Sequence, residues 1–351
     1  MDEQEEFSKR TYRYRLLEKV VVKMDIDFVI TWVDDKDPIW RAKREKYTGK
    51  KSVEGNEDGR YRDWDTLKYW FRGVEKFAPW VRYIYFVTDD QKPEWLDLEH
   101  PKLKWIKHTD YIPAEYLPTF HSNVIEWNFH RIPGLTENFV YFNDDVFLIR
   151  DTVPEDFFVN NLPCDLPELG YIYPASFWAN VLFNNTVLLN RHFSLKNCIK
   201  NNKEKWIRHQ SAKSLLKNTI YGRKDLISGI EHGHIHAAYK KSMFETLWEK
   251  EYDAIDETCQ HKLRTKNDVS HWCVRDWLLL SGMFHPAKSI GKAFSTASLN
   301  DSDEAIQYLR KQKGKVICLN DSETEDNFEL HKQMIIEEFE KLLPDKSAFE
   351  L

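Results

Sequence analysis

Three runs of β-branched and aromatic residues, each ending at or one residue before a pair of acidic residues, constrain the fold of this chain more than any other feature. The runs are 26–33 (IDFVITWV), 83–88 (YIYFVT) and 139–142 (FVYF), and the pairs are Asp34-Asp35, Asp89-Asp90 and Asp144-Asp145. Such runs are typical of buried strands. A further strand is expected at 103–106, and helical spacing is evident at 65–77 and around 122–131. This alternation predicts an α/β fold with a doubly wound, mostly parallel sheet.

The acidic pairs predict where such a sheet would bind a ligand. In open α/β sheets, ligands lie beyond the carboxyl ends of the strands. The three acidic strand ends could therefore meet at one site. Acidic residues also end strands because they favour turns, so the pattern alone leaves both interpretations open.

Periodicity divides the rest of the chain into segments. We expect an N-terminal extension at 1–24, a first part of the core at 25–160, a helical lid or subdomain at 161–230, a second part of the core at 231–321 and a helical tail at 322–351. Within the extension, the basic stretch 11–24 would pack on the domain or contact a membrane surface. The polar residues 41–59 predict a mobile excursion from the core.

Composition excludes several function classes. With 51 basic and 57 acidic residues the net charge is −6, which argues against a nucleic-acid partner. No glycine-rich phosphate-binding motif is present. The five cysteines form no C-x-x-C pair, the N-terminus lacks the pattern of a signal peptide, and no apolar run could span a bilayer. These features predict a cytoplasmic protein.

The residues themselves offer three candidate groups for chemistry. Asp144 and Asp145 could bind Mg²⁺ or Mn²⁺ across the phosphates of a nucleotide, or simply form a turn. His232, His234 and His236 would share one side of a strand, which suits a metal; a single catalytic histidine is at least as economical, and a structural role is also open.

The third group is basic. Arg264 or Arg275 could neutralise a phosphoryl group or lie in solvent, and Glu126 could accept a proton, lie beside a metal or form a salt bridge. Trp127, Trp178 and Trp272 are candidates for stacking on a sugar. Together these groups indicate metal-assisted phosphoryl or glycosyl transfer.

Four segments carry a resemblance to a known family. In their order along the chain, these segments resemble the signature segments of the Stealth family. They are residues 26–37, 60–96, 118–147 and 316–321, and a further region lies at 231–285. That family comprises bacterial capsular and cell-wall polysaccharide phosphotransferases and the animal lysosomal-enzyme GlcNAc-1-phosphotransferase. The matching segments cover roughly half of the chain.

The resemblance implies a fold and an activity. The fold would be a GT-A-like, nucleotide-sugar-binding α/β core. The enzyme would transfer hexose 1-phosphate from a UDP-hexose to a hydroxyl of an oligosaccharide or lipid-linked polysaccharide, with Mg²⁺ or Mn²⁺, and release UMP. It would act in the cytoplasm, with peripheral contact at the inner membrane face. The alternatives are a metal-dependent glycosyltransferase and a glycan-binding module, and no residue pattern indicates an oligomeric state.

The resemblance also implies roles for individual residues. The catalytic residues would be His234, Arg264, Glu126 and Asp145, the nucleotide would contact Trp32, Asp34, Arg62, Asp63 and Asn320, and the metal would bind Asp144, Asp145 and Asp321. The family often has His-x-Pro where this chain has His234-Ile235-His236. Either histidine could therefore be the base, and the spacing to Arg264 favours His234.

Overall fold

A mostly parallel sheet forms the centre of the protein. The computed structural model describes residues 24–49, 54–296, 298–321 and 325–351. Within these ranges the central sheet has the order β3-β2-β1-β4-β8. Its members are β1 (Ile26–Thr31), β2 (Ile84–Thr88), β3 (Leu103–Lys107), β4 (Asn138–Phe142) and β8 (Ala237–Lys240). The first four strands are parallel and β8 is antiparallel at the edge. The predicted α/β fold class is confirmed.

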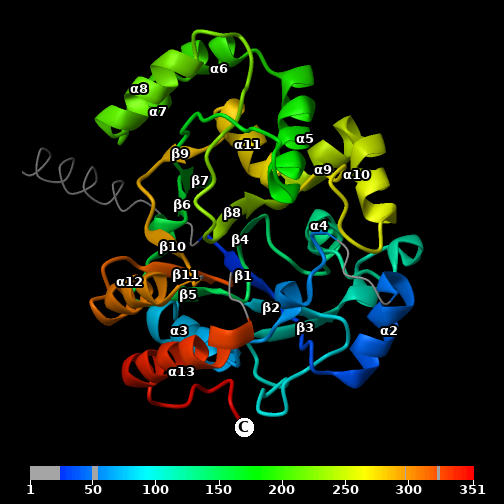
Figure 1. Cartoon of the computed structure of the whole chain (residues 1–351). Coiled ribbons are helices and arrows are strands. Elements are labelled where there is room, and N and C mark those ends of the chain that lie inside the picture. Colours follow the sequence, from blue (N-terminus) through cyan, green and yellow to red (C-terminus); the bar gives the residue numbers. More distant parts are fainter. Residues whose placement is uncertain (1–23, 50–53, 297, 322–324) are drawn as a thin grey trace, which may run out of the picture.

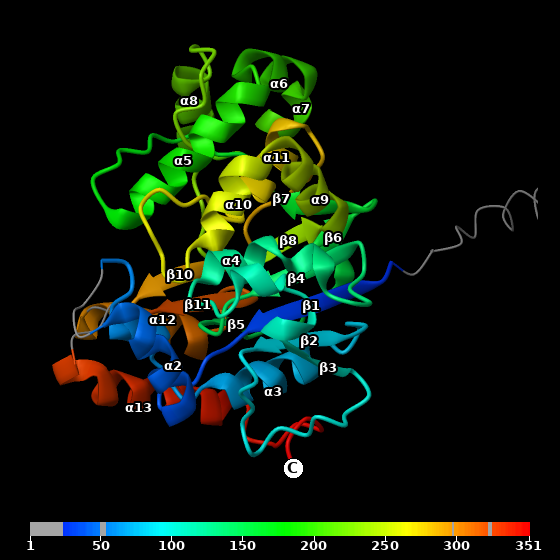
Figure 2. The same cartoon turned by 90° about the vertical axis from the view of Figure 1, so that its right-hand side faces the viewer.

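Helices cover both faces of this sheet, as Figures 1 and 2 show. On one face lie α3 (Leu67–Phe77) and α13 (Glu325–Leu342), and on the other lie α4 (Ser122–Trp127), α9 (Lys241–Lys250) and α11 (Trp272–Leu280). Successive side chains of a strand point to opposite faces. Accordingly, Phe28 of β1 packs in the core with α3, whereas its neighbour Val29 packs in the core with α4. The strands read as continuous apolar runs because both faces are buried.

A second, smaller sheet extends the core beyond the acidic end of β4. It consists of β5 (Val146–Leu148), β10 (Gly291–Ser295) and β11 (Val316–Asn320), with α12 (Leu299–Arg310) packed on it. Helix α3 approaches β5 so closely that a Cβ at Gly73 would lie 2.9 Å from the carbonyl oxygen of Leu148. The backbone N–H of Leu319 donates to the carbonyl of Asp145 over 2.9 Å, so the end of β11 lies beside the end of β4.

The segment 161–230 is mainly helical. Its helices are α5 (Phe177–His192), α6 (Leu195–Asn201), α7 (Lys203–Ile207) and α8 (Ala212–Tyr221). They follow the small strands β6 (Phe158–Val159) and β7 (Leu162–Asp165), which form a third sheet with β9 (His285–Pro286). These helices lie together at the top of Figure 1, above the central sheet. Helix α10 (Tyr252–Gln260) contacts α4 and α9 beside the sheet.

One expectation about the core is wrong. The segment 41–59 was expected to leave the core as a mobile excursion, but its first part, 41–48, belongs to helix α2 (Pro38–Thr48). The carboxylate of Asp37 accepts from the N–H of Ile39, and proline occupies the first turn, which are both strong helix-start signals. Buried Trp40 attaches α2 to the domain by packing against Tyr61 and Phe120.

Two expectations concern membranes. The expected extension 1–24 lies outside the described residues except for Met24. Whether its basic stretch packs on the domain or contacts a membrane therefore stays a prediction. Across the described ranges, no helix has both the length and the apolar character needed to cross a bilayer.

Candidate active site

A pocket of about 530 Å³ opens at the carboxyl ends of β1, β2 and β4. Nearly all of the predicted site residues line it, although they come from distant parts of the sequence. They are Trp32, Arg62, Asp63, Glu126, Asp144, Asp145, His234, Arg264, Asn320 and Asp321. The structure therefore brings the predicted catalytic, nucleotide-binding and metal-binding residues to one cavity, with a single exception, Asp34.

Asp34 does not face this pocket. Its carboxylate accepts from the N–H of Lys36 over 2.8 Å, which closes the turn after β1. The side chain of Gln91 fixes the same turn through the backbone of Asp34. The expected convergence of acidic strand ends is thus correct for Asp144-Asp145 and for Asp89, which lines the pocket but is paired with Lys43 over 2.6 Å.

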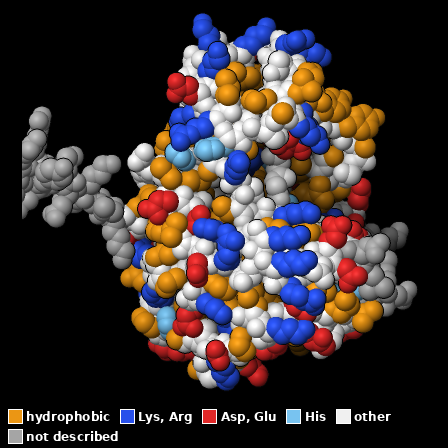
Figure 3. All heavy atoms as spheres, turned by 90° about the vertical axis from the view of Figure 1, so that its left-hand side faces the viewer, with side chains coloured by type: hydrophobic (Ala, Val, Ile, Leu, Met, Phe, Trp, Pro, Cys, Tyr) orange, Lys and Arg blue, Asp and Glu red, His pale blue; other side chains and the backbone are white. Residues whose placement is uncertain are grey.

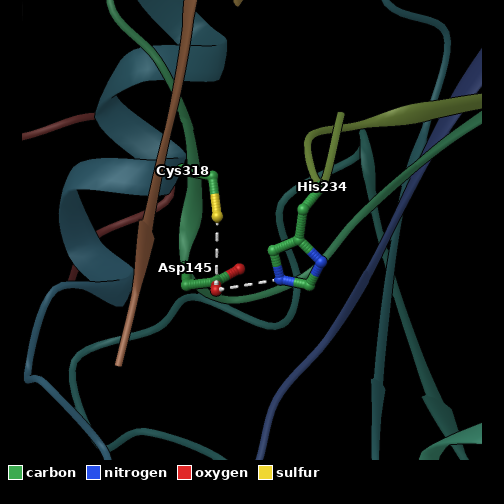
Figure 4. Close-up of side chains that lie close together, drawn as sticks. All are labelled: Asp145, His234 and Cys318. Atoms are coloured by element: carbon green, nitrogen blue, oxygen red, sulfur yellow. Dashed lines mark hydrogen bonds and ion pairs between the residues drawn. The ribbon is translucent and has the colours of Figure 1, made fainter. Parts of the chain in front are cut away.

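The turn between β4 and β5 concentrates negative charge at the floor of the pocket. Figure 4 shows that Asp145 points between two residues from other segments: its Oδ2 accepts from the Cys318 thiol over 3.4 Å and lies 3.9 Å from Nε2 of His234. The other oxygen, Oδ1, is buried without a hydrogen bond to any described residue. Burial raises the pKa of Asp145, and burial together with the charges of Asp145 and Asp63 raises the pKa of Asp144 well above its usual range.

These residues fit a hard divalent cation. An orphaned carboxylate oxygen beside a second carboxylate supplies the oxygen ligands that Mg²⁺ and Mn²⁺ favour. Cys318 lies within 4.8 Å of the same group, but burial raises the pKa of its thiol well above the usual range, so the thiol remains a protonated donor to Asp145. Asp321 is instead held by Arg62, which donates to both of its oxygens over 2.8 and 2.9 Å.

The three neighbouring histidines do not share one side of a strand. They precede β8 in an irregular segment in which His234 has a φ of 42°, and their rings point to three different places. His232 contacts Asp276 and stacks on Trp272, and both histidine and tryptophan line the pocket. Of the three, His234 is the ring that approaches Asp145.

His236 points away from the pocket. Its ring is buried against Phe142 and Phe157, and burial lowers its pKa to about 4. It is absent from the residues that line the cavity. The geometry therefore favours His234 over His236 as the candidate base.

Arg264 enters the pocket from the loop between α10 and α11. Its backbone pairs with the side chain of Asn56, and its guanidinium donates to Tyr61 Oη over 3.0 Å and to Ser122 Oγ over 3.3 Å. Its Nε is buried and makes no hydrogen bond to a described residue. A fixed guanidinium that lines the cavity is suited to an anion there. Arg275 instead pairs with Asp165 and does not line the pocket.

Glu126 lies in α4 in an environment that favours its neutral form. Burial raises the pKa of this carboxyl to about 7, although the hydrogen bond from Tyr141 and the nearby charge of Arg264 oppose the shift. Its second oxygen lies 3.5 Å from Nε2 of His271. Burial lowers the pKa of His271 to about 3, so this neutral ring, which also bonds Tyr239 Oη over 2.8 Å, can donate toward Glu126.

A buried carboxylate connects the Glu126 helix to the Arg264 loop. Asp268 receives hydrogen bonds from His121 over 2.6 Å, from His261 over 2.7 Å and from the N–H and hydroxyl of Thr265 over 2.5 and 2.8 Å. Because Nδ1 of His121 accepts from the N–H of Asn123, its Nε2 carries the proton that goes to Asp268. This network fixes the N-terminus of α4 relative to Arg264.

Sequence reasoning missed several residues that line the pocket or touch its charged groups. Tyr61, His271 and Cys318 carry no motif signal, because their position depends on segments that meet only in the fold. Of the three tryptophans expected to stack on a sugar, Trp178 of α5 and Trp272 line the pocket. Trp127 is wrong as a candidate, because its ring is completely buried in the core.

Comparisons with known proteins agree with this site. Models of conserved regions 1 and 2 of Stealth proteins match residues 24–52 and 60–164. The capsular polysaccharide phosphotransferase WcwK of Streptococcus pneumoniae is 41% identical over 93% of this chain and 98% of its own. The receptor polysaccharide phosphotransferase WefC of Streptococcus oralis is 38% identical over 93% and 99%. The exopolysaccharide phosphotransferase cps2G of Lactiplantibacillus plantarum is 35% identical over 93% and 96%.

A solved structure, mouse xyloside xylosyltransferase 1, is 11% identical, and its alignment covers 85% of this chain and 98% of its own with a TM-score of 0.36. The sequence relatives, by contrast, match along nearly their whole length, and the matched regions include the acidic strand ends and Glu126. The chain belongs to the Stealth family of phosphotransferases.

Proposed function

We propose that this protein transfers hexose 1-phosphate from a UDP-hexose to a sugar hydroxyl of a growing surface polysaccharide and releases UMP. The observation that carries the proposal is the meeting of a histidine, an arginine and a pair of carboxylates around one cavity. Those are the groups that proton transfer and phosphoryl transfer require. The relatives' names, which specify capsular and exopolysaccharide phosphotransferases, support a polysaccharide acceptor.

In the proposed reaction the acceptor oxygen attacks the phosphorus that bears the hexose. A new P–O bond forms, the bond from this phosphorus to the bridging oxygen breaks, and UMP leaves. His234 takes the hydroxyl proton, because its half-exposed ring stands at the pocket and is accessible to an acceptor. The imidazolium that results is stabilised by Asp145, whose Oδ2 lies 3.9 Å from Nε2.

The donor is held by groups on the other walls of the cavity. Arg264 lines the cavity with a guanidinium that Tyr61 and Ser122 hold in place, and it supplies positive charge to the phosphates. Glu126 lies near it, and its pKa of about 7 lets it hold or release a proton. Trp32, Asp63, Asn320 and the Arg62–Asp321 pair line the part of the pocket formed by the ends of β1 and β11, which we assign to the nucleotide. Asp34 shapes the adjoining turn.

Asp144 and Asp145 would hold Mg²⁺ or Mn²⁺, which supplies neutralisation of diphosphate charge when bound. The chain's own contribution is to gather two buried carboxylates: burial raises the pKa of both, and the charge of Asp145 adds to the rise for Asp144. With a UDP-hexose as the donor, we assign the reaction to the cytoplasmic side of the membrane.

Analysis of the released nucleotide tests this proposal. The protein is incubated with Mn²⁺, oligosaccharide acceptors and a panel of UDP-sugars, and the nucleotides are separated by anion-exchange chromatography. We expect acceptor-dependent UMP. Release of UDP with formation of a glycoside would identify a glycosyltransferase instead. Absence of any thermal stabilisation by UDP-sugars would favour a glycan-binding module and would reject the proposal.

A further inference from the structure

The helical layer α6–α8 differs in charge from the rest of the molecule. Residues 195–225 contain nine lysines and arginines and two acidic residues, whereas the whole chain has a net charge of −6. Seven of these basic residues are exposed, and none of the seven forms an ion pair with another described residue. Figure 3 shows basic side chains along the top of the molecule, where Figure 1 places this layer, with hydrophobic side chains beside them.

Helix α8 presents its apolar side chains to solvent. Leu216 is 61% and Ile220 is 53% exposed, and helical spacing places Lys213 on the same face. The opposite face carries the buried polar residues Ser214 and Asn218, and Tyr221 at its end packs against the core. A helix that buries polar residues and exposes aliphatic ones has an orientation that its own packing does not explain.

Hydrogen bonds account for this inverted orientation. The side chain of Asn218 accepts from the N–H of Leu169 over 2.7 Å and donates to the carbonyl of Pro167 over 3.0 Å. Lys217, at the edge of the outer face, pairs with Glu168 and Glu231. The polar inner face is therefore fixed to the segment after β7, and the outer face is left with aliphatic side chains among unpaired cations.

We propose that this outer face docks on the surface of an anionic lipid bilayer. Aliphatic side chains surrounded by lysines and arginines combine burial in the acyl boundary with attraction to anionic headgroups. Two more exposed side chains add aliphatic surface to this layer, Ile207 of α7 and Leu226 after α8. An anionic glycan is a poorer match, because recognition of a sugar face favours aromatic platforms and Leu216 and Ile220 offer none.

This surface is connected to the active-site pocket by α5. The first turns of α5 supply Trp178 and Leu182 to the pocket lining, and Leu189 near its other end packs in the same core as Leu195 of α6. Its 16 residues span about 24 Å. A docked layer would therefore hold the pocket about one helix length from the lipid, within reach of an acceptor attached to it. Docking itself does not depend on the transfer reaction.

Vesicle co-sedimentation of the full chain tests the proposal. The vesicles are phosphatidylcholine alone or phosphatidylcholine mixed with phosphatidylglycerol. Two double variants remove the two components of the surface: Leu216→Gln with Ile220→Gln, and Lys213→Glu with Lys224→Glu. Matched controls make the same changes elsewhere on exposed residues, at Leu330→Gln and at Lys311→Glu with Lys313→Glu. Circular dichroism and thermal unfolding verify the fold of each variant.

We expect the wild type to bind only vesicles that contain phosphatidylglycerol, and less tightly as salt is added. Each double variant in the layer should lower the partition coefficient at least about tenfold, while the controls should change it by less than about twofold. The proposal is overturned if the wild type does not bind these vesicles, or if the layer variants bind as the wild type does.

Two results that identify a different partner for this outer face would also overturn the proposal of membrane docking. If the layer mediates self-association, Leu216→Gln with Ile220→Gln would convert a dimer to a monomer in analytical ultracentrifugation while vesicle binding is absent. If it binds polyanionic glycan, the lysine variant would weaken binding to a soluble phosphorylated polysaccharide and leave vesicle binding unchanged.

Discussion

At the scale of single residues, the site consists of groups whose burial opposes their charge. Burial raises the pKa of Asp144, Asp145 and Glu126, and each of them would be more stable in the folded chain if it were neutral. Such groups persist where function requires them, and they make stability and activity respond in opposite directions to substitution.

Asp145→Asn should show this opposition most clearly. We expect turnover to fall by about a hundredfold or more, because the carboxylate beside His234 is lost. In chelator at pH 8, the free energy of unfolding should rise by about 1 kcal/mol, because a neutral amide avoids the penalty of a buried carboxylate. Steady-state assays and urea titrations measure the two effects.

Asp90→Asn provides the control for Asp145→Asn. Asp90 also follows a strand, but it is exposed, pairs with Lys107 and does not line the pocket. Turnover of this variant should equal that of the wild type. Near-normal turnover of Asp145→Asn would contradict the assigned role.

Glu126→Gln should change the pH dependence of stability. A carboxyl whose pKa is raised to about 7 in the folded chain contributes stability that is present below its ordinary pKa and is lost as the pH rises through 7. We therefore expect the glutamine variant to unfold like the wild type at pH 5. At pH 8 it should be more stable by about 2 kcal/mol, as measured by urea unfolding.

The exposed Glu115→Gln variant is the reference for this experiment, since it should shift stability equally at both pH values. A Glu126→Gln variant whose stability relative to the wild type is the same at pH 5 and pH 8 would show that Glu126 is ionised in the folded protein.

At the scale of elements, the site depends on contacts between segments that are adjacent in space but distant in the sequence. Asp268 joins the start of α4, which carries Glu126, to the loop that carries Arg264. We expect Asp268→Ala to lower the free energy of unfolding by about 3 kcal/mol, because four donors, of which His121 is completely buried, lose their acceptor. It should also lower kcat, because Arg264 is no longer fixed.

The comparison for Asp268→Ala is Asp256→Ala in α10. That variant removes the hydrogen bond from Tyr116 at a position away from the pocket. It should lower stability by about 1 kcal/mol and leave kcat unchanged. An Asp268→Ala protein that is destabilised yet keeps its full kcat at a temperature where it is folded would show that the network does not position Arg264.

At the scale of the whole molecule, the sequence was sufficient where structure is determined locally. Strands such as 26–31 and the acidic ends after them were predictable, because strand propensity and the position of turn residues are properties of short segments. The direction in which each histidine ring points was not predictable, because it depends on partners such as Asp145 and Asp276, which are distant in the sequence.

Two further features of the fold were not predicted from the sequence. Helix α2 was mistaken for an excursion because its polar composition outweighed the short Asp37-Pro38 start signal and the single buried anchor Trp40. In α8, the helical period separates a polar face from an apolar one, but only the long-range hydrogen bonds of Asn218 show that the polar face is the buried one.

The central claim is that the acceptor oxygen attacks phosphorus, and ³¹P NMR of the product tests it most directly. The purified enzyme is incubated with its preferred UDP-hexose, Mn²⁺ and an oligosaccharide acceptor, and the oligosaccharide product is isolated. The account predicts a phosphodiester resonance in the product, absent with His234→Ala. A product that contains the transferred hexose but no phosphorus would contradict it.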